Sequence, residues 1–165
     1  MIEVDTLLTG GIVVTMDPDR RVFEPGSIAV KAGKIVAIGD TGAIDGRYQP
    51  RHRLDCAGHI VFPGLIDVHA HAGHALVKSM GMHSGDRWED ICGEVYTQAS
   101  PPEFWYAEAR LAALERLRFG VTTGVSLLGG GDTIMRTDGP EYAAAHCRGV
   151  VTLGTRSVVA VGPTR

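Results

Sequence analysis

Short apolar runs separated by turn residues fill the first part of the chain. Residues 3–39 contain VDTLLTG, GIVVTMD, SIAVKAG and KIVAIGD, with DPDR and the pair Ala32-Gly33 between runs. β-Branched residues bounded by turn residues are typical of strands in hairpins. We therefore expect a small antiparallel β-unit, then a loop over residues 42–53 rich in Gly, Arg and Pro, and one more strand at RLDCAG.

Longer apolar elements follow Gly58. The run IVFPGLIDVHA, from Ile60, is almost continuously apolar, as in a strand buried on both faces of a parallel sheet. Ser100 and Glu103 form a capping-box pattern that predicts an amphipathic helix over 103–119. The apolar positions that define its expected buried face are Phe104, Ala107, Leu111, Leu114 and Leu117.

Further strands and a helix follow Gly120. VTTGVSLL predicts a second strand, residues 140–148 a short helix, and VVTLGTRSVVAVG a third strand. This alternation is typical of βα units with right-handed crossovers. The expected organisation is a small β-sandwich portion over 1–58 and the first βα units of an incomplete α/β barrel over 59–165.

The polar residues of the first buried strand are the strongest candidates for chemistry. Side chains alternate along a strand, so Leu65, Asp67, His69 and His71 are expected on one face and Ile66, Val68 and Ala70 on the other. Three buried polar groups on one face need a partner, and a bound cation would satisfy them. The Cα atoms of His69 and His71 would lie roughly 7 Å apart, close enough for both rings to bind one ion. Asp67 would orient a ligand from behind.

The position of this histidine pair strengthens a motif that is weak alone. A His-x-His triplet arises readily by chance in a chain with seven histidines. His69 and His71, however, end a buried strand, and ligands gather at the carboxyl ends of parallel strands. The sequence therefore favours a metal site.

Composition restricts the partners. The net charge is -3 and no basic stripe is present, which argues against nucleic acid and favours a small-molecule substrate. The N-terminus MIEVDTLLTGG lacks the features of a signal peptide or membrane helix, so we expect a cytoplasmic protein without membrane association. Cys56, Cys92 and Cys147 are widely spaced and interpreted as reduced thiols.

The segment PGLIDVHAH, preceded by KIVAIG and DCAGHIVF, resembles the amidohydrolase superfamily, in particular its cytosine-deaminase-like and triazine-hydrolase-like branch. The resemblance implies the N-terminal part of a (βα)8 TIM barrel, about three strands, preceded by part of a small β-sandwich, with barrel strand one running from Ile60 to His71. It implies one or two divalent transition metal ions (zinc, cobalt, iron or manganese) bound by His69 and His71. The family's other ligands, and its general base, have no match in this chain.

The resemblance also implies an activity. The stretch SMGMHSGDRWEDI is most similar to phenylurea and thiocarbamate (molinate) hydrolases, so we expect metal-activated water to attack a urea, carbamate, thiocarbamate or amide. An aminohydrolase (deaminase) or dechlorinase of a nitrogen heterocycle is an alternative. A non-catalytic subunit or binding module is an alternative of another class.

A complete barrel needs about 250 residues, more than this chain contains after its β-unit. We therefore expect a C-terminal fragment of the same precursor, or a second chain, to complete the barrel, and this chain alone to be insufficient for activity. The ending Pro163-Thr164-Arg165 fits a proteolytic cut, although an artificial end there is an alternative. A homo-oligomer of the nicked protomer is expected, because open sheet edges associate.

Several other residues are weaker candidates. His74 follows the metal pair and can contact substrate or be a solvated loop residue. Trp88 can line the substrate pocket or pack in the core. His146 is interpreted as ordinary helix surface, and the glycines at 129–131 as a flexible loop on the active-site side.

Overall fold

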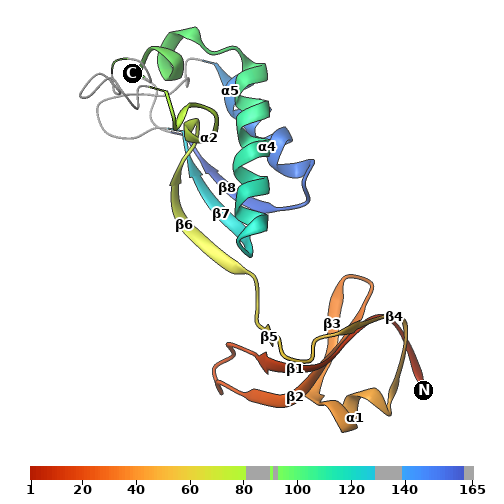
Figure 1. Ribbon diagram of the computed structural model, residues 1–165. Helices are drawn as coiled ribbons and strands as arrows, with labels where there is room; N and C mark the ends of the chain where they lie inside the picture. The colour runs from red at the N-terminus through yellow and green to blue at the C-terminus, as the bar shows by residue number, and fades with distance from the viewer. Residues whose placement is uncertain (81–89, 91–92, 129–138, 162–165) are drawn as a thin grey trace. The chain divides into compact units, whose positions relative to one another are not determined.

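The computed structural model describes the chain except for residues 81–89, 91–92, 129–138 and 162–165 (Figure 1). It divides into two compact units, Met1–Pro63 and Gly64–Arg165, which are described separately. The division falls after the predicted boundary at residue 58 because Ile60–Val61 pairs with the first strand of the first unit. The strand that carries the histidines consequently begins at Leu65 and not at Ile60.

The first unit is a mixed β-sheet with one short helix. Its strands follow the order β3-β2-β1-β4, and β5 also pairs with β1. The β1–β2 and β2–β3 pairs are antiparallel, whereas β4 and β5 run parallel to β1. The elements are β1 (Ile2–Val14), β2 (Val22–Lys31), β3 (Lys34–Asp40), α1 (Thr41–Asp45), β4 (Tyr48–Asp55) and β5 (Ile60–Val61).

Two expectations for this unit are wrong. The first two apolar runs form one strand, because Gly10 adopts φ 78° at a register irregularity that lets β1 continue instead of turning. The segment 42–53 is not a loop but contains most of α1 and much of β4. Helix α1 carries the chain across, so β4 returns parallel to β1 and the sheet is not purely antiparallel.

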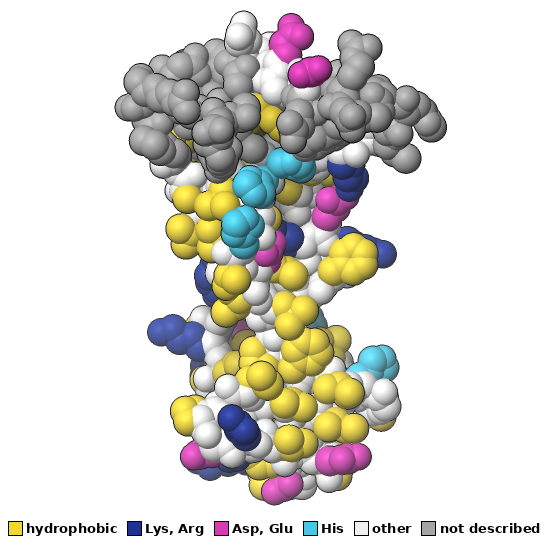
Figure 2. All heavy atoms as spheres, turned by 90° about the vertical axis from the view of Figure 1, so that its left-hand side faces the viewer, with side chains coloured by type: hydrophobic (Ala, Val, Ile, Leu, Met, Phe, Trp, Pro, Cys, Tyr) yellow, Lys and Arg dark blue, Asp and Glu magenta, His cyan; other side chains and the backbone are white. Residues whose placement is uncertain are grey.

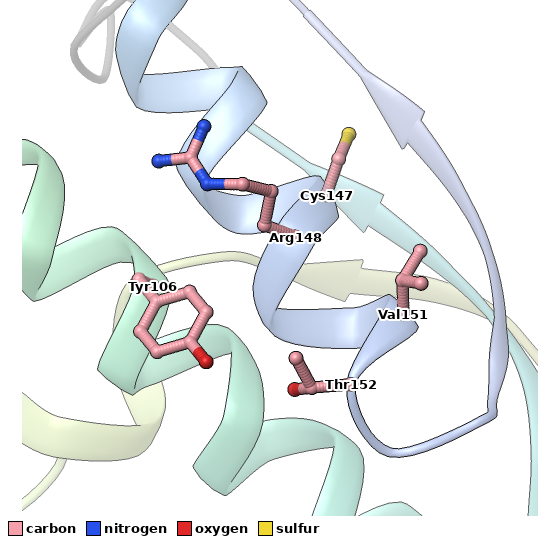
Figure 3. A pocket seen from close by; sticks show the side chains of 5 residues that line it. All are labelled: Tyr106, Cys147, Arg148, Val151 and Thr152. Carbon is pink, nitrogen blue, oxygen red and sulfur yellow. The ribbon is translucent and has the colours of Figure 1, made fainter.

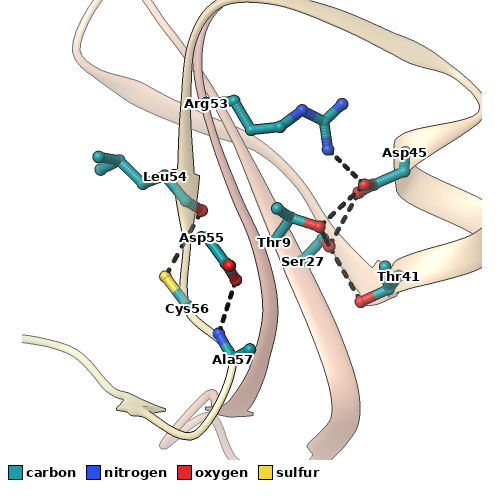
Figure 4. Close-up of polar contacts among 9 residues, drawn as sticks. All are labelled: Thr9, Ser27, Thr41, Asp45, Arg53, Leu54, Asp55, Cys56 and Ala57. Atoms are coloured by element: carbon teal, nitrogen blue, oxygen red, sulfur yellow. Dashed lines mark hydrogen bonds and ion pairs between the residues drawn. The ribbon is translucent and has the colours of Figure 1, made fainter.

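A partly buried polar cluster joins α1 to the sheet (Figure 4). Ser27 is fully buried, and its Oγ lies 2.9 Å from Asp45 Oδ1 and 3.1 Å from Thr41 Oγ1. Thr9 Oγ1 donates to Asp45 Oδ2 at 2.8 Å, and Arg53 pairs with the same oxygen. Burial raises the pKa of Asp45, but the hydrogen bonds from Thr9, Arg53 and Ser27 outweigh it and hold this pKa below its usual value.

The second unit is a three-stranded parallel sheet, β6-β7-β8, with helices α4 and α5 on one side (Figure 1). This order confirms the predicted succession of βα units. The elements are β6 (Leu65–His71), α2 (His74–Val77), a π-helical segment (Val95–Ala99), α4 (Pro102–Arg118), β7 (Val121–Leu127), α5 (Pro140–Val151) and β8 (Arg156–Ala160).

Helix α4 lies close to its predicted range but buries a different face. Its buried residues are Trp105, Glu108, Ala109 and Ala113. Leu114 and Leu117, expected in the core, are 48% and 38% exposed. The small side chains let α5 approach closely, since a Cβ at Gly149 would meet Ala109 Cβ at 2.8 Å. The face of α4 that is buried is thus the one whose small residues let α5 come close, and not the one with the largest apolar side chains.

The predicted capping box at the start of α4 is also wrong. Helix α4 begins after Pro101, and no side chain caps it. Ser100 is buried and instead accepts a hydrogen bond from Trp105 Nε1 at 3.0 Å. The serine thus satisfies the indole N–H of Trp105, which is fully buried.

Candidate metal centre

His69 and His71 lie at the carboxyl end of β6, where their rings lie close together in an edge-to-face arrangement. The two Nε2 atoms are 3.3 Å apart, and the ring centroids are 5.2 Å apart. Nitrogens bound at about 2.0–2.1 Å to a tetrahedral zinc ion are about 3.3–3.4 Å apart. The observed separation therefore fits two ligands of one ion. Among the described residues, no group of three or more metal-binding side chains is found, so these two imidazoles form an incomplete ligand set.

The third polar residue of this strand, Asp67, does not share their face. Asp67 pairs with Gly124 and Ala70 with Ser126, so three steps along β6 oppose two along β7. Residues 124 and 126 share a face of β7, whereas His71 pairs with Leu127 on the opposite face. A β-bulge between Asp67 and Ala70 thus breaks the alternation on which the prediction rested.

The side chain of Asp67 accounts for this bulge. Its Oδ1 accepts a hydrogen bond from the backbone N–H of His69 at 3.2 Å. A side-chain acceptor two residues back offers the backbone an alternative to the sheet ladder. Asp67 therefore acts on a histidine of the pair through the backbone, from the other face of the strand.

Arg116, which no sequence motif singles out, holds Asp67 in place. Its Nε donates to Asp67 Oδ2 at 3.1 Å, Nη1 to Ser126 Oγ at 3.2 Å, and Nη2 to the Val125 carbonyl at 3.2 Å. Gly124 makes room, because a Cβ there would lie 2.8 Å from Arg116 Cζ. One guanidinium thereby joins β6 and β7 behind the histidines. The sequence signals for this contact were an acidic residue within the strand and an arginine in the last turn of the following helix.

His74 extends the histidine pair into a cluster of three rings. Its ring centroid is 5.7 Å from that of His71 and 5.3 Å from that of Tyr96. Histidine side chains gather together on the surface in Figure 2. Gly73 has φ 91°, and a Cβ there would meet Tyr96 Cε1 at 2.6 Å. His74 begins helix α2 and is not part of an irregular loop.

The surroundings of His71 favour its neutral imidazole. Partial burial, followed by the neighbouring rings of His74 and His69, lowers the pKa of His71 below its ordinary value. Metal ions bind imidazole only in its neutral form. His71 consequently stays in the ligand form at lower pH than an isolated histidine.

The remaining candidates have different outcomes. Trp88, the glycines at 129–131 and the ending Pro163-Thr164-Arg165 lie outside the described residues. His146 was expected at the surface, but its side chain is only 1% exposed, facing α4. It is buried because α5 packs closely against α4 at this position.

No described helix is long and apolar enough to cross a membrane.

A groove separate from the histidines lies between α4 and α5 (Figure 3). Its volume is about 590 Å³, and its lining residues are Tyr106, Cys147, Arg148, Val151 and Thr152. These residues come from the two helices and the turn after α5, and none is a histidine or a carboxylate. The groove therefore offers no metal ligands of the kind found at β6.

The chain is similar in sequence to known enzymes. A 5-methylthioadenosine/S-adenosylhomocysteine deaminase of Syntrophobacter fumaroxidans is 35% identical over 121 residues, covering 72% of this chain and 27% of that protein. A deaminase of the same name from Symbiobacterium thermophilum is 31% identical over 157 residues, covering 94% of this chain and 33% of that protein. This chain belongs to the amidohydrolase superfamily. It spans about a third of the length of these relatives. No family model matches the chain.

Solved structures confirm the fold. A triazine hydrolase from Arthrobacter aurescens matches with a TM-score of 0.65 and 24% identity, over 93% of this chain and 34% of that protein. An adenosine deaminase from Xanthomonas campestris with bound zinc matches with a TM-score of 0.70 and 24% identity, over 95% of this chain and 34% of that protein. The predicted N-terminal part of a TIM barrel, preceded by part of a β-sandwich, is thereby confirmed.

Proposed function

We propose that this chain contributes two metal ligands to a divalent-metal-dependent aminohydrolase that removes an amino group from a nitrogen heterocycle, the adenine ring of a thio-substituted nucleoside being the first candidate. The observation that carries the proposal is the 3.3 Å separation of the Nε2 atoms of His69 and His71. The relatives named as 5-methylthioadenosine/S-adenosylhomocysteine deaminases favour this alternative over the urea and thiocarbamate hydrolases expected from SMGMHSGDRWEDI.

The described residues have distinct roles in this proposal. His69 and His71 hold the ion, and the lowered pKa of His71 keeps its imidazole neutral. Asp67 and Arg116 fix the bulge that brings the two rings together. His74 lies beside the pair, where it can contact substrate. A bound divalent ion supplies Lewis-acid activation of the attacking water.

The remaining ligands and the general base come, in this proposal, from residues outside this chain, supplied by the same precursor or by a second chain. The incomplete ligand set among the described residues supports this requirement. In the overall reaction, water replaces the ring amino group, the ring carbon gains an oxygen, and ammonia leaves. The assembly that performs it, including any homo-oligomer, is part of the proposal.

The metal site is tested by measuring zinc content in the purified, intact protein. We expect His69→Ala and His71→Ala each to lower the zinc content to a small fraction of the wild-type value. His52→Ala is the matched control, because His52 is also an exposed histidine on a strand but lies in the first unit. Wild-type protein without a transition metal, or His69→Ala with full metal content, would leave a non-catalytic binding module as the better explanation.

The substrate class is tested with the zinc-loaded, intact protein. We expect ammonia release from 5-methylthioadenosine or S-adenosylhomocysteine, and its loss in His69→Ala. A phenylurea, a thiocarbamate and an aminated triazine serve as comparison substrates. Amine release from the urea or thiocarbamate alone would replace the aminohydrolase proposal with the hydrolase expected from the sequence.

A further inference from the structure

A carboxylate and an imidazole are buried together between α4 and α5. The side chains of Glu108 and His146 are each 1% exposed, and Glu108 Oε2 lies 3.5 Å from His146 Nδ1. In the part of the chain that the structure describes, neither ring nitrogen of His146 has a hydrogen-bond partner that meets strict geometry. The pair belongs neither to the metal ligands nor to the Arg116 network.

The other oxygen of Glu108 reaches the segment that carries His74. Glu108 Oε1 accepts a hydrogen bond from the backbone N–H of Ala75 at 3.4 Å. Ala75 follows His74 directly and lies in α2, whose first residue is His74. The backbone of Ala72, on the other side of Gly73, donates to the Leu127 carbonyl at 2.9 Å. The segment between His71 and α2 is therefore attached at two points, to β7 and to Glu108.

Packing alone does not account for this pair. Close contact between α4 and α5 is already provided by small residues, since a Cβ at Gly149 would lie 2.6 Å from the Tyr106 carbonyl oxygen. An apolar pair of similar volume fills a buried space at lower desolvation cost than two ionisable groups. A buried carboxylate is instead expected where its hydrogen bonds hold a particular backbone in place.

We propose that Glu108, supported by His146, is a positioning residue that fixes the backbone of Ala75 and thereby sets the place of His74 beside the metal-binding pair. This inference rests on the proposed metal site for its functional consequence. Glu108 contacts neither His69 nor His71 and acts through the turn that follows them. His146 is the buried imidazole that lies beside this carboxylate, with Nδ1 3.5 Å from Glu108 Oε2.

The test uses the intact protein with an apolar double replacement, Glu108→Met with His146→Leu. Replacing both partners of a buried pair with apolar side chains is often neutral for global stability, so this variant is expected to fold. The single variant Glu108→Met leaves His146 without its partner and serves for comparison. Glu103→Met is the matched control, because Glu103 is an exposed glutamate of the same helix.

The first measurement is hydrogen exchange at the Ala75 amide. We expect exchange to be about tenfold faster or more in the double variant, because the acceptor at Glu108 is gone, with the urea midpoint of global unfolding nearly unchanged. The control Glu103→Met should exchange like the wild type. Wild-type exchange at Ala75 in the double variant would overturn the proposal and leave the pair a packing element.

The second measurement is Co²⁺ binding, followed by visible absorption. We expect the double variant to bind Co²⁺ about tenfold more weakly and with an altered spectrum, whereas Glu103→Met should match the wild type. Unchanged affinity and spectrum, in a protein whose His69→Ala variant loses the ion, would overturn the positioning role and leave the metal site standing. A wild-type protein that binds no Co²⁺ would overturn the proposed function and the role of Glu108 with it.

Discussion

Arg116→Met removes the guanidinium that joins the two strands behind the histidine pair and keeps a side chain of similar length. Three hydrogen bonds disappear, to Asp67, to Ser126 and to the Val125 carbonyl. The side chains of Arg116 and Asp67 are 16% and 30% exposed, so water restores only part of what is lost. The variant therefore tests whether this network stabilises the second unit.

The expected loss of stability follows from these contacts. Hydrogen bonds to charged groups contribute about 1.5–3 kcal/mol each, and a carbonyl left without its donor costs about 1–3 kcal/mol. Part of this loss of free energy is offset, because water can hydrate Asp67 and the apolar methionine side chain replaces the packing of the arginine stem. We expect Arg116→Met to lower the free energy of unfolding by about 2–4 kcal/mol, or the urea midpoint by about 1–2 M.

Tryptophan fluorescence during urea unfolding measures this change. Both tryptophans of the sequence, Trp88 and Trp105, belong to the second unit, and Trp105 is fully buried. The matched control is Arg118→Met, since Arg118 is an exposed arginine in the same last turn of α4. A change below about 0.5 kcal/mol is expected for the control. Equal midpoints for Arg116→Met and Arg118→Met would refute the stabilising role of the network.

Three further substitutions test the turn after β6 and the first unit. Gly73→Ala should lower the free energy of unfolding by about 2–4 kcal/mol and shift the NMR signals of the neighbouring ring, because φ is 91° and Tyr96 Cε1 lies 2.6 Å from the new Cβ. Gly58→Ala, with φ 74° in open space, should cost only about 1 kcal/mol in urea unfolding followed by circular dichroism, because Gly58 lies in the first unit, which has no tryptophan. The pKa of Asp45 is lower in the folded than in the unfolded state, so its stabilisation is present above about pH 4 and lost as the pH falls through the folded-state pKa. The stability advantage of wild type over Asp45→Asn in urea should therefore shrink at acidic pH, and a constant difference would contradict this.

The alternation of strands and helices in the second unit was predictable because its apolar residues are spaced as in strands or as in helices. VTTGVSLL and the helix before it lie close to their expected ranges, whereas the run VVTLGTRSVVAVG is not one strand: it begins with the end of α5, and β8 starts only at Arg156. The buried face of α4 was not predictable, since large residues such as Leu114 look like core residues, whereas Ala109 faces α5. Parallel pairing of β4 with β1 depends on contacts distant in sequence, which periodicity does not report.

The two histidines were predictable from position, but the arrangement that brings them together was not. Strict alternation placed Asp67 on their face, whereas the bulge puts it on the helix side, against Arg116. The signal was nevertheless in the sequence: an aspartate two residues before His69 can accept that residue's N–H and take it out of the ladder. Asp67, which was expected to orient a metal ligand from the same face of the strand, thus instead causes the β-bulge. The two rings of the His-x-His spacing converge here because the strand is irregular at that point. Asp67, Arg116 and the missing side chain at Gly124, which leaves room for the guanidinium, are therefore as much a part of the site as the two histidines.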